Sequence, residues 1–567
     1  MKYFCNPLNV EYKYQFRKCN KTGPDFRVFR EAADPSVLFY QGKYYIFASM
    51  SLGVYVSEDL ADWVYYKLDE KLPLYDYAPD VRIINGYVYL CASKADGVSD
   101  FYRTKNILEG PYEKIPGSFP FWDPNLFQDD DGRIYLYWGS SNAFPLYGVE
   151  LNPDTMKPVG VRKELIFARE DRNGYERFGE GHSAPACGTE AIPTYIEGAW
   201  MTKHAGRYYL QYACTGTEFN VYGDGVYISE RPLGPFRLAK NNPYSYLPGG
   251  FMTGAGHGST FMSKDGGLWH AATLRISVNN DYERRLGLWK AGFDENGELY
   301  CDQRYGNWPA AVTAKNGQKP FSNPPWYLLS YGKNMEASSF YEGAEPERAA
   351  DENCRTCWKA GTADPGEWLQ VDLDRVMDVR AVQVNFGDDE LIVALPPEGA
   401  FPEEERYIDK NSHPIRWKLE GSEDGTAYFM IEDKSGTKKD FVHDFIVKEE
   451  GIPARFLKLT VLQMPFNGPA CVSGLRVFGF GGGKKPGIPQ YQAVRTADMD
   501  MEVRIEGNGA VGYNILWGNA PDKLYHSYMT FGLSQRVGAL VIGTDYYVRV
   551  DAFNESGITE GKTILLA

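Results

Sequence analysis

The sequence has little basic charge and no long apolar run. Its 567 residues include 60 Lys or Arg against 75 Asp or Glu, which gives a formal net charge of −15. A chain of this charge repels phosphate backbones and anionic lipid surfaces, so neither nucleic-acid binding nor membrane association is expected. No stretch approaches the roughly 18 apolar residues of a membrane-spanning helix. The expected partner is therefore an uncharged molecule.

Cysteine is scarce, and its placement does not suggest disulfides. The nine cysteines are an odd number. Several lie in strand-like runs such as 89–92 and 212–214, which is typical of reduced thiols that pack as small hydrophobic side chains. Residues 1–7 lack the apolar core of a secretory signal. Together these features predict a cytoplasmic protein.

Aromatic residues and glycine are abundant. The chain has 41 Tyr, 31 Phe and 12 Trp, together with 59 Gly and 34 Pro. This combination favours many short strands and tight turns over helices. At roughly 100 to 200 residues per domain, the length suggests about three domains. An all-β protein with several domains is predicted.

One short phrase occurs five times in the first 310 residues. It consists of a glycine followed by aromatic and β-branched residues, and it begins at Gly42, Gly86, Gly132, Gly206 and Gly267. The first three copies lie about 45 residues apart, which is the length of a four-stranded propeller blade, and the later intervals contain insertions. Residues 1–315 are therefore predicted to form a five-bladed β-propeller.

A polar residue precedes each glycine by six to ten positions. These residues are Asp34, Asp80, Asp123, Glu197 and His257. Equivalent positions in successive blades converge on the propeller axis, so the five are expected to share one position around a central polar well. Acidic side chains brought together repel one another unless function requires them.

Two linkers divide the remainder of the chain. Residues 315–325 are polar and rich in proline, and residues 479–487 are rich in glycine. Both are compositions typical of connecting segments. The blocks at 330–480 and 487–567 show the alternation of β-strands. They are predicted to be a β jelly-roll and an immunoglobulin-like β-sandwich.

Residues from about 30 to 310 resemble glycoside hydrolase family 43. The resemblance rests on Ala33-Asp34-Pro35, on Trp122-Asp123-Pro124 and on Glu197-Gly198-Ala199-Trp200, where the family more often has proline at Ala199. It implies an inverting glycosidase with Asp34 as general base, Asp123 as pKa modulator and Glu197 as general acid. An Asp-Pro pair that merely begins a turn is the alternative for Asp34.

Inverting hydrolysis places two demands on these carboxyl groups. The acid and the base must face each other across the sugar, roughly 6.5 to 9.5 Å apart, so that a water molecule fits between them. The acid must also hold a proton near neutral pH. Glu197 is therefore expected to have a pKa raised by burial and nearby negative charge, while Asp34 stays ionised.

Four further residues are candidates for the site. Asp80 is expected to bind a sugar hydroxyl or to take the modulator role of Asp123. Trp122 and Arg275 are expected to contact substrate, with a salt bridge the alternative for Arg275. His257, in Gly256-His257-Gly258, resembles the family's histidine near an axial calcium ion or water cluster; a strand-end histidine is the alternative. No cofactor is expected to be required, with a structural calcium ion on the axis left open.

The two following blocks carry weaker resemblances. Residues 334–479 resemble a discoidin-type (coagulation factor five/eight C-type) domain through 367–373 and 455–459, and in carbohydrate enzymes such a domain often binds sugar or supports the propeller. The last block resembles a fibronectin type III domain, because residues 543–550 carry a tyrosine typical of that fold's tyrosine corner.

The predicted function is the release of a terminal α-L-arabinofuranosyl or β-D-xylosyl unit from oligosaccharides by an exo-acting enzyme. A hydrolase for galactose-type glycosides on the same fold is one alternative. A non-catalytic propeller that binds carbohydrate is another. A retaining enzyme of the fructosidase or phosphorylase kind is disfavoured, because the chain lacks an Asn-Asp-Pro-Asn opening and a Glu-Cys acid motif.

Overall fold

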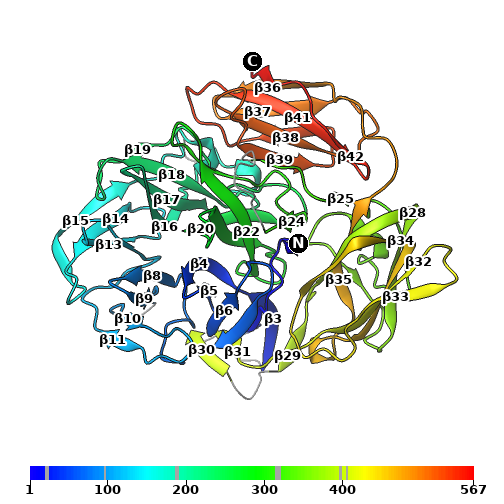
Figure 1. Ribbon diagram of the computed structural model, residues 1–567, viewed down its shortest axis with the longest axis horizontal. Helices are drawn as coiled ribbons and strands as arrows, with labels where there is room; N and C mark the ends of the chain where they lie inside the picture. The colour runs from blue at the N-terminus through cyan, green and yellow to red at the C-terminus, as the bar shows by residue number, and fades with distance from the viewer. Residues whose placement is uncertain (20–23, 95–96, 186–190, 313–320, 395–398, 404–405) are drawn as a thin grey trace.

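The computed structural model describes the chain except residues 20–23, 95–96, 186–190, 313–320, 395–398 and 404–405 (Figure 1). Within this part, strands are joined by loops and by four short 3₁₀ helices. The helices are η1 (Gly174–Glu176), η2 (Glu180–His182), η3 (Pro346–Ala350) and η4 (Pro465–Asn467). None of the helices described is long and apolar enough to cross a membrane. The all-β prediction is confirmed.

Five four-stranded antiparallel sheets follow one another along the chain, which confirms the five-bladed propeller. Blade one contains β4 (Ala33–Tyr40), β5 (Lys43–Ser49), β6 (Gly53–Ser57) and β7 (Val64–Lys67). Blade two contains β8 (Asp80–Ile84), β9 (Tyr87–Cys91), β10 (Phe101–Thr104) and β11 (Glu113–Ile115). Blade three contains β12 (Asn125–Gln128), β13 (Ile134–Trp138), β14 (Leu146–Leu151) and β15 (Pro158–Ile166). Blade four contains β16 (Tyr195–His204), β17 (Arg207–Thr215), β18 (Gly223–Ser229) and β19 (Arg237–Leu238), and blade five contains β20 (Thr253–Met262), β21 (Leu268–Arg275), β22 (Arg284–Phe293) and β23 (Leu299–Cys301).

In three blades the backbone conformation explains why the repeated residue is glycine. Gly42, Gly86 and Gly206 each form the second residue of a two-residue hairpin loop between the first and second strands. Their φ angles are 83°, 77° and 78°, and the residue before each also has a positive φ. Two consecutive positive φ angles define the type I′ turn, which matches the twist of paired strands and favours glycine.

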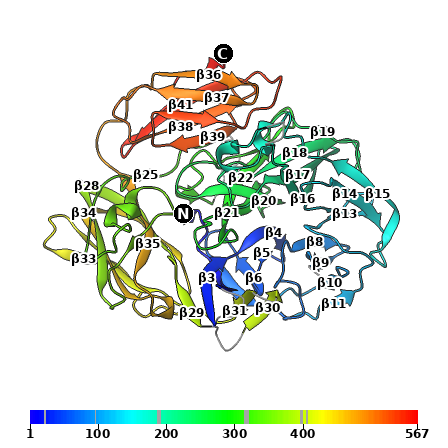
Figure 2. The same cartoon turned by 180° about the vertical axis from the view of Figure 1, so that it is seen from behind.

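Segments far apart in sequence close the propeller and join it to the rest of the chain. β1 (Tyr3–Phe4) pairs with β24 (Ala310–Ala311). A five-stranded sheet then combines β2 (Lys13–Lys18) and β3 (Asp25–Glu31) with three strands from the middle of the chain, β29 (Ile392–Ala394), β30 (Gly399–Glu403) and β31 (Arg406–Asp409). Figures 1 and 2 show β30 and β31 beside the blue strands of the N-terminal region. The sequence patterns did not predict this shared sheet.

The middle of the chain forms an eight-stranded sheet. Its strands are β25 (Tyr327–Leu328), β26 (Asn334–Ala337), β27 (Trp358–Lys359), β28 (Glu367–Phe386), β32 (Arg416–Ser422), β33 (Tyr428–Asp433), β34 (His443–Gln463) and β35 (Cys471–Phe480). Trp358 and Trp417 are fully buried in its core. The predicted linker at 315–325 lies mostly outside the described residues, and the discoidin resemblance stays a prediction.

The C-terminal region consists of a three-stranded and a five-stranded sheet. The first has β36 (Tyr491–Ala497), β37 (Asp500–Ile505) and β40 (Ser534–Val537); the second has β38 (Gly512–Gly518), β39 (His526–Thr530), β41 (Tyr547–Asn554), β42 (Gly557–Thr559) and β43 (Ile564–Leu565). The Tyr546 hydroxyl accepts a hydrogen bond from the Val541 N–H at 3.1 Å. A tyrosine hydroxyl that bonds to upstream backbone is typical of a tyrosine corner, although the fibronectin resemblance stays a prediction.

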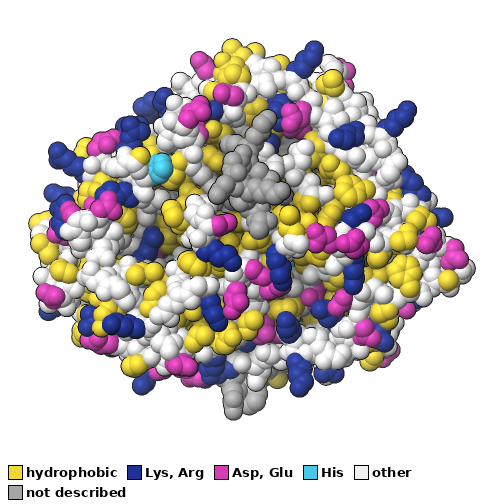
Figure 3. Space-filling model, viewed as in Figure 1, with side chains coloured by type: hydrophobic (Ala, Val, Ile, Leu, Met, Phe, Trp, Pro, Cys, Tyr) yellow, Lys and Arg dark blue, Asp and Glu magenta, His cyan; other side chains and the backbone are white. Residues whose placement is uncertain are grey.

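The distribution of charged side chains on the surface and the state of the cysteines agree with the amino-acid composition. On the face shown in Figure 3, basic and acidic side chains are interspersed among apolar ones. The eight cysteines of the described residues are all free, and most are buried. They pack as small hydrophobic side chains, as their strand-like surroundings predict.

Candidate active site

A strained corner stands at the inner edge of every blade. The corner residue has a positive φ, and the five are Asp34 (51°), Ala78 (51°), Asp123 (51°), Gly198 (58°) and His257 (49°). The expectation that Asp34, Asp80, Asp123, Glu197 and His257 share one position is therefore wrong for two of them: Asp80 comes two residues after its corner and Glu197 one residue before. Irregularities in strand pairing span the corners of blades one, four and five.

A hydroxyl of the preceding blade holds three of the corners. The bonds run from Asp34 N to Thr273 Oγ1 (2.8 Å), from Ala78 N to Ser49 Oγ (2.7 Å) and from Asp123 N to Ser93 Oγ (2.8 Å). Each acceptor follows an alanine at or just beyond the end of a second strand. This recurrent Ala-Ser or Ala-Thr pair is a sequence signal for the corners that the glycine repeat did not reveal.

A cavity of about 450 Å³ opens at these corners. It brings together five of the predicted site residues, Asp34, Trp122, Asp123, Glu197 and His257. Its other lining residues include the rings of Tyr77, Phe178, Tyr195 and Tyr282. Aromatic side chains combine an apolar face with a polar edge, which suits the faces and hydroxyls of a sugar.

Asp34 lies at the buried side of the cavity with strong partners for its negative charge. Ser49 donates a hydrogen bond to Oδ2 at 2.6 Å, and Arg284 Nη1 lies 3.1 Å from Oδ1. Burial alone raises the pKa of this carboxyl group, but Arg284, His257 and the hydroxyl donors outweigh burial, so the pKa is below its ordinary value. Asp34 is therefore ionised at neutral pH.

Arg284 is a site residue that sequence reasoning missed. Its Nη2 lies 2.7 Å from Glu31 Oε1, and the other oxygen of Glu31 accepts a hydrogen bond from Arg406. All three side chains are buried. Arg284 is the first residue of β22, the third strand of its blade. The sequence repeat marks the first two strands of each blade, so it does not point to a polar residue in the third. Arg406 comes from β31 in the middle of the chain, so only the shared sheet places it behind Asp34.

Glu197 and Asp123 lie on the other side of His257. Glu197 Oε1 accepts a hydrogen bond from the Tyr222 hydroxyl at 2.7 Å, and Oε2 accepts one from Ser140 at 3.0 Å. Burial raises the pKa of Asp123 to about 7; the charges of Glu197 and Asp34 add to the rise, while His257 opposes it. The strongly raised pKa thus belongs to the residue predicted to tune Glu197.

His257 lies between the two aspartates. Its Nδ1 is 3.4 Å from Asp34 Oδ1 and 3.8 Å from Asp123 Oδ2. Burial lowers the pKa of His257, but the surrounding carboxylates outweigh burial and raise it overall. A Cβ at Gly198 would lie 2.7 Å from this ring, so the corner of blade four has no room for a larger residue. In the part of the chain described, no group of three His, Cys, Asp or Glu is arranged to hold a metal ion, and the axial calcium stays a prediction.

Asp80 and Arg275 are not among the residues that line this cavity. Asp80 accepts hydrogen bonds from Asn125 Nδ2 at 2.9 Å and from Leu126 N at 2.7 Å, so its carboxylate joins blades two and three. Arg275 Nη2 lies 2.7 Å from Glu180 Oε1, the salt bridge considered as its alternative. It also donates to the Glu218 carbonyl, and the Glu218 side chain lines the cavity.

The C-terminal sheets hold one wall of the cavity. The wall is the insertion before blade four, which carries Phe178. Next to it, Arg177 forms a buried ion pair with Asp500 at 2.6 Å and donates to the Gly538 carbonyl at 2.8 Å. The N–H of Gly174, in η1, donates to the Leu540 carbonyl at 2.8 Å. The insertion is thus bonded to the C-terminal region by side chains and backbone.

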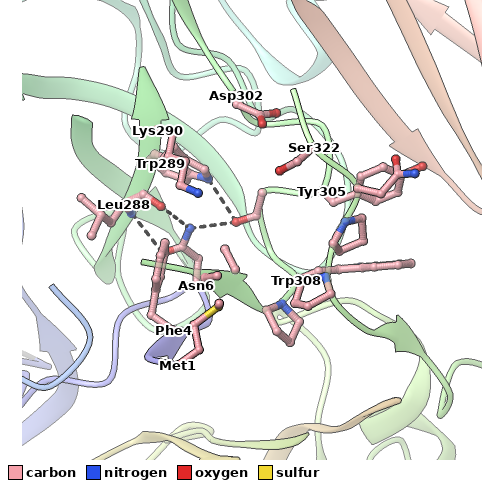
Figure 4. A pocket seen from close by; sticks show the side chains of 17 residues that line it. Met1, Phe4, Asn6, Leu288, Trp289, Lys290, Asp302, Tyr305, Trp308 and Ser322 are labelled. Atoms are coloured by element: carbon pink, nitrogen blue, oxygen red, sulfur yellow. Dashed lines mark hydrogen bonds between the residues drawn. The ribbon is translucent and has the colours of Figure 1, made fainter. Parts of the chain in front are cut away.

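A second cavity, of about 230 Å³, lies where β1 and β24 close the propeller (Figure 4). Asn6 crosses it and donates hydrogen bonds to the Leu288 and Gly306 carbonyls at 2.9 and 2.8 Å. Seven of its 17 lining residues are aromatic or proline, and Asp302 is the single acidic residue among the 17. It lacks the group of carboxyl side chains, Asp34, Asp123 and Glu197, that lines the cavity of about 450 Å³ at the blade corners. The larger cavity is therefore the candidate active site.

Two carboxyl groups whose pKa values are shifted in opposite directions, lowered for Asp34 and raised for Asp123, lie in a cavity lined by aromatic rings, and glycoside hydrolysis uses carboxyl groups in such a setting. Residues 28–299 match the family model described as Glycosyl hydrolases family 43, so the chain carries a domain of that family.

Curated relatives cover the same region. The chain is 28% identical over 226 residues to the "Beta-D-galactofuranosidase xynD" of Aspergillus niger, covering 38% of this chain and 57% of the relative. It is 28% identical over 278 residues to the "Putative beta-xylosidase" of Escherichia coli, covering 42% and 47%. A solved thermostable family-43 glycoside hydrolase is 23% identical, covering 56% of this chain and 100% of that one, with a TM-score of 0.42. The chain spans about half the length of the first two relatives.

Asp500→Asn tests the support given to Phe178. The change leaves Arg177 buried without its anion, and breaking a buried pair costs roughly 3 to 5 kcal/mol locally. We expect KM to rise about tenfold, with a smaller change in kcat, because the wall loses its position while the carboxyl groups keep theirs. Glu502→Gln on the same strand, which removes an exposed pair with Arg504, is the matched control. Equal kinetics for the two variants would contradict the supporting role.

Proposed function

We propose that the protein is an inverting, exo-acting glycoside hydrolase that releases a terminal α-L-arabinofuranosyl or β-D-xylosyl unit from oligosaccharides. One observation carries the proposal: the cavity holds Asp34, whose pKa Arg284 keeps low, together with Glu197 and with Asp123, whose pKa burial and the charge of Glu197 raise to about 7. Carboxyl groups with separated pKa values are what general base and general acid catalysis need.

Each residue then has one task. Asp34 takes a proton from a water molecule as the water oxygen attacks the anomeric carbon. Glu197 gives a proton to the glycosidic oxygen as the bond to the leaving group breaks, and its bonds from Tyr222 and Ser140 orient it. Asp123 lies close enough to Glu197 for their charges to repel, so an ionised Asp123 favours the protonated form of Glu197 that donates the proton. Arg284 and His257 stabilise the anionic form of Asp34.

The size of the cavity supports an exo mode of action. Ligand pockets of roughly 300 to 1,000 Å³ enclose small molecules, and a cavity of about 450 Å³ suits a terminal sugar with its nearest neighbour. The pentose preference is supported by relatives named as xylosidases or arabinosidases. A second candidate, a galactofuranosidase, is supported by the name of the Aspergillus niger relative.

A panel of aryl glycosides tests the proposal directly. The panel contains α-L-arabinofuranoside, β-D-xyloside, β-D-galactofuranoside and β-D-galactoside. We expect the highest kcat/KM on one of the two pentosides, and proton NMR should show the first-formed sugar with inverted anomeric configuration. A preference for the galactofuranoside would select the second candidate, and early product with retained configuration would refute inversion.

Glu197→Gln tests the acid. Loss of general acid catalysis costs roughly 10² to 10⁴ in rate, and the loss falls on substrates whose leaving group needs protonation. We expect kcat/KM to fall by that range on an oligosaccharide but less than about tenfold on a dinitrophenyl glycoside. Glu218→Gln removes another carboxylate of the same cavity, and it should lower kcat/KM on the oligosaccharide and on the dinitrophenyl glycoside by the same factor. Equal losses in Glu197→Gln would remove its acid role.

Arg284→Gln tests the base. Arg284 lowers the pKa of Asp34, so its removal raises that pKa, and the base becomes protonated at a higher pH. The acidic limb of the kcat/KM profile should therefore move upward by about one pH unit. Arg275→Gln, which removes an arginine bonded to Thr253, Glu218 and Glu180, should leave the limb in place. An unmoved limb in Arg284→Gln would mean that Asp34 is not the base.

A further inference from the structure

Three arginines stand side by side across the sheet that joins the propeller to the middle of the chain. Arg17 on β2 is directly opposite Arg27 on β3 and, on its other side, Arg406 on β31. Directly opposed residues point to the same face of a sheet, and like charges in that position are destabilising. The alternate residues Phe16 and Val28 are buried on the other face. Electrostatic repulsion within the row of arginines therefore destabilises the sheet, and the presence of the row needs an explanation.

Only one of the three arginines is neutralised. Arg406 is buried against Glu31, and the charge of Arg17 acts with burial to lower its pKa. Arg17, Arg27 and the adjacent Lys18 make no ion pair or side-chain hydrogen bond with any residue that the structure describes.

The unpaired cations line a concavity of about 310 Å³, which we call the arginine pocket. Its lining includes Arg17, Lys18, Arg27, Phe29, Asn279 and Asn280. Asn279 is held in place: its Nδ2 donates to the Asp388 carbonyl and its Oδ1 accepts from Glu390 N at 3.0 Å. The next two residues, Asp281 and Tyr282, line the active-site cavity. The two hollows therefore meet at one loop.

We propose that the arginine pocket binds an oxyanion on the substrate, a uronic acid carboxylate or a sulfate ester, on the part of the oligosaccharide that extends out of the active-site cavity. The inference rests on the proposed function and names its substrate class as acidic oligosaccharides. Guanidinium groups bind carboxylate and sulfate oxygens through paired hydrogen bonds, and amide groups such as Asn280 add neutral donors. The overall charge predicts an uncharged ligand, whereas this local group of cations selects a charged one.

Binding is measured in the Glu197→Gln background by isothermal titration calorimetry. Three matched oligosaccharides end in α-L-arabinofuranose and differ in the neighbouring units, which are neutral, uronic or sulfated. We expect at least one acidic ligand to bind about five- to tenfold more tightly than the neutral one, since each exposed charge contact contributes up to about 1 kcal/mol. The advantage should disappear at about 0.5 M salt. Preference for the uronic or the sulfated ligand identifies the oxyanion.

Two double variants in that background decide the location. Arg17→Gln with Arg27→Gln should abolish the acidic advantage, whereas Lys157→Gln with Lys163→Gln, exposed cations beside or in β15, should keep it. Equal affinity for all three ligands would overturn the proposal, as would an advantage that survives the arginine changes. If the acidic advantage is present but the wild-type protein cleaves no glycoside of the panel, the pocket stands and the proposed hydrolase function falls.

Discussion

The ion pair between Arg284 and Asp34 is the contact on which the rest of the site depends. Asp34 is buried, and a buried carboxyl group without a cation takes up a proton. Arg284 is itself buried and shared with Glu31, which in turn binds Arg406. This alternation of charges places a cation beside each of the two buried carboxyl groups and lowers the pKa of Asp34. It also explains why Asp34 and Asp123, both corner residues of their blades, differ in pKa: only Asp34 has an arginine beside it.

The two C-terminal regions are part of the active-site structure. Arg406 reaches Glu31 from the strands that the middle of the chain adds to the N-terminal hairpin. On another side, Asp500 and the backbone around Leu540 hold the insertion that carries Phe178. Both contacts are buried, charged and specific in geometry, so they position a side chain more tightly than apolar packing alone.

Much of the site was predictable, because the propeller repeats one local pattern. The turn glycines mark the hairpins, and the strand before each hairpin leads to the axis. That reasoning placed Asp34, Asp123, Glu197 and His257 around one cavity. It failed for Asp80, because the corner of blade two is Ala78, eight residues before Gly86 as Asp34 is eight before Gly42, and Asp80 lies two residues beyond that corner. Asp80 consequently bonds Asn125 and Leu126 rather than lining the cavity.

The residues that prediction missed are those whose partners are distant in sequence. Arg284 and Arg285 are adjacent in the sequence and no motif marks which of them faces the cavity, and Arg406 lies beyond every motif. The sequence by itself determined the all-β class, the five blades and the carboxyl groups of the site, because turn chemistry and strand alternation are local. The tertiary structure decided that the pKa is lowered for Asp34 and raised for Asp123, and that Arg284 rather than Arg285 pairs with Asp34, because burial and ion pairing depend on side chains that only the folded chain brings together.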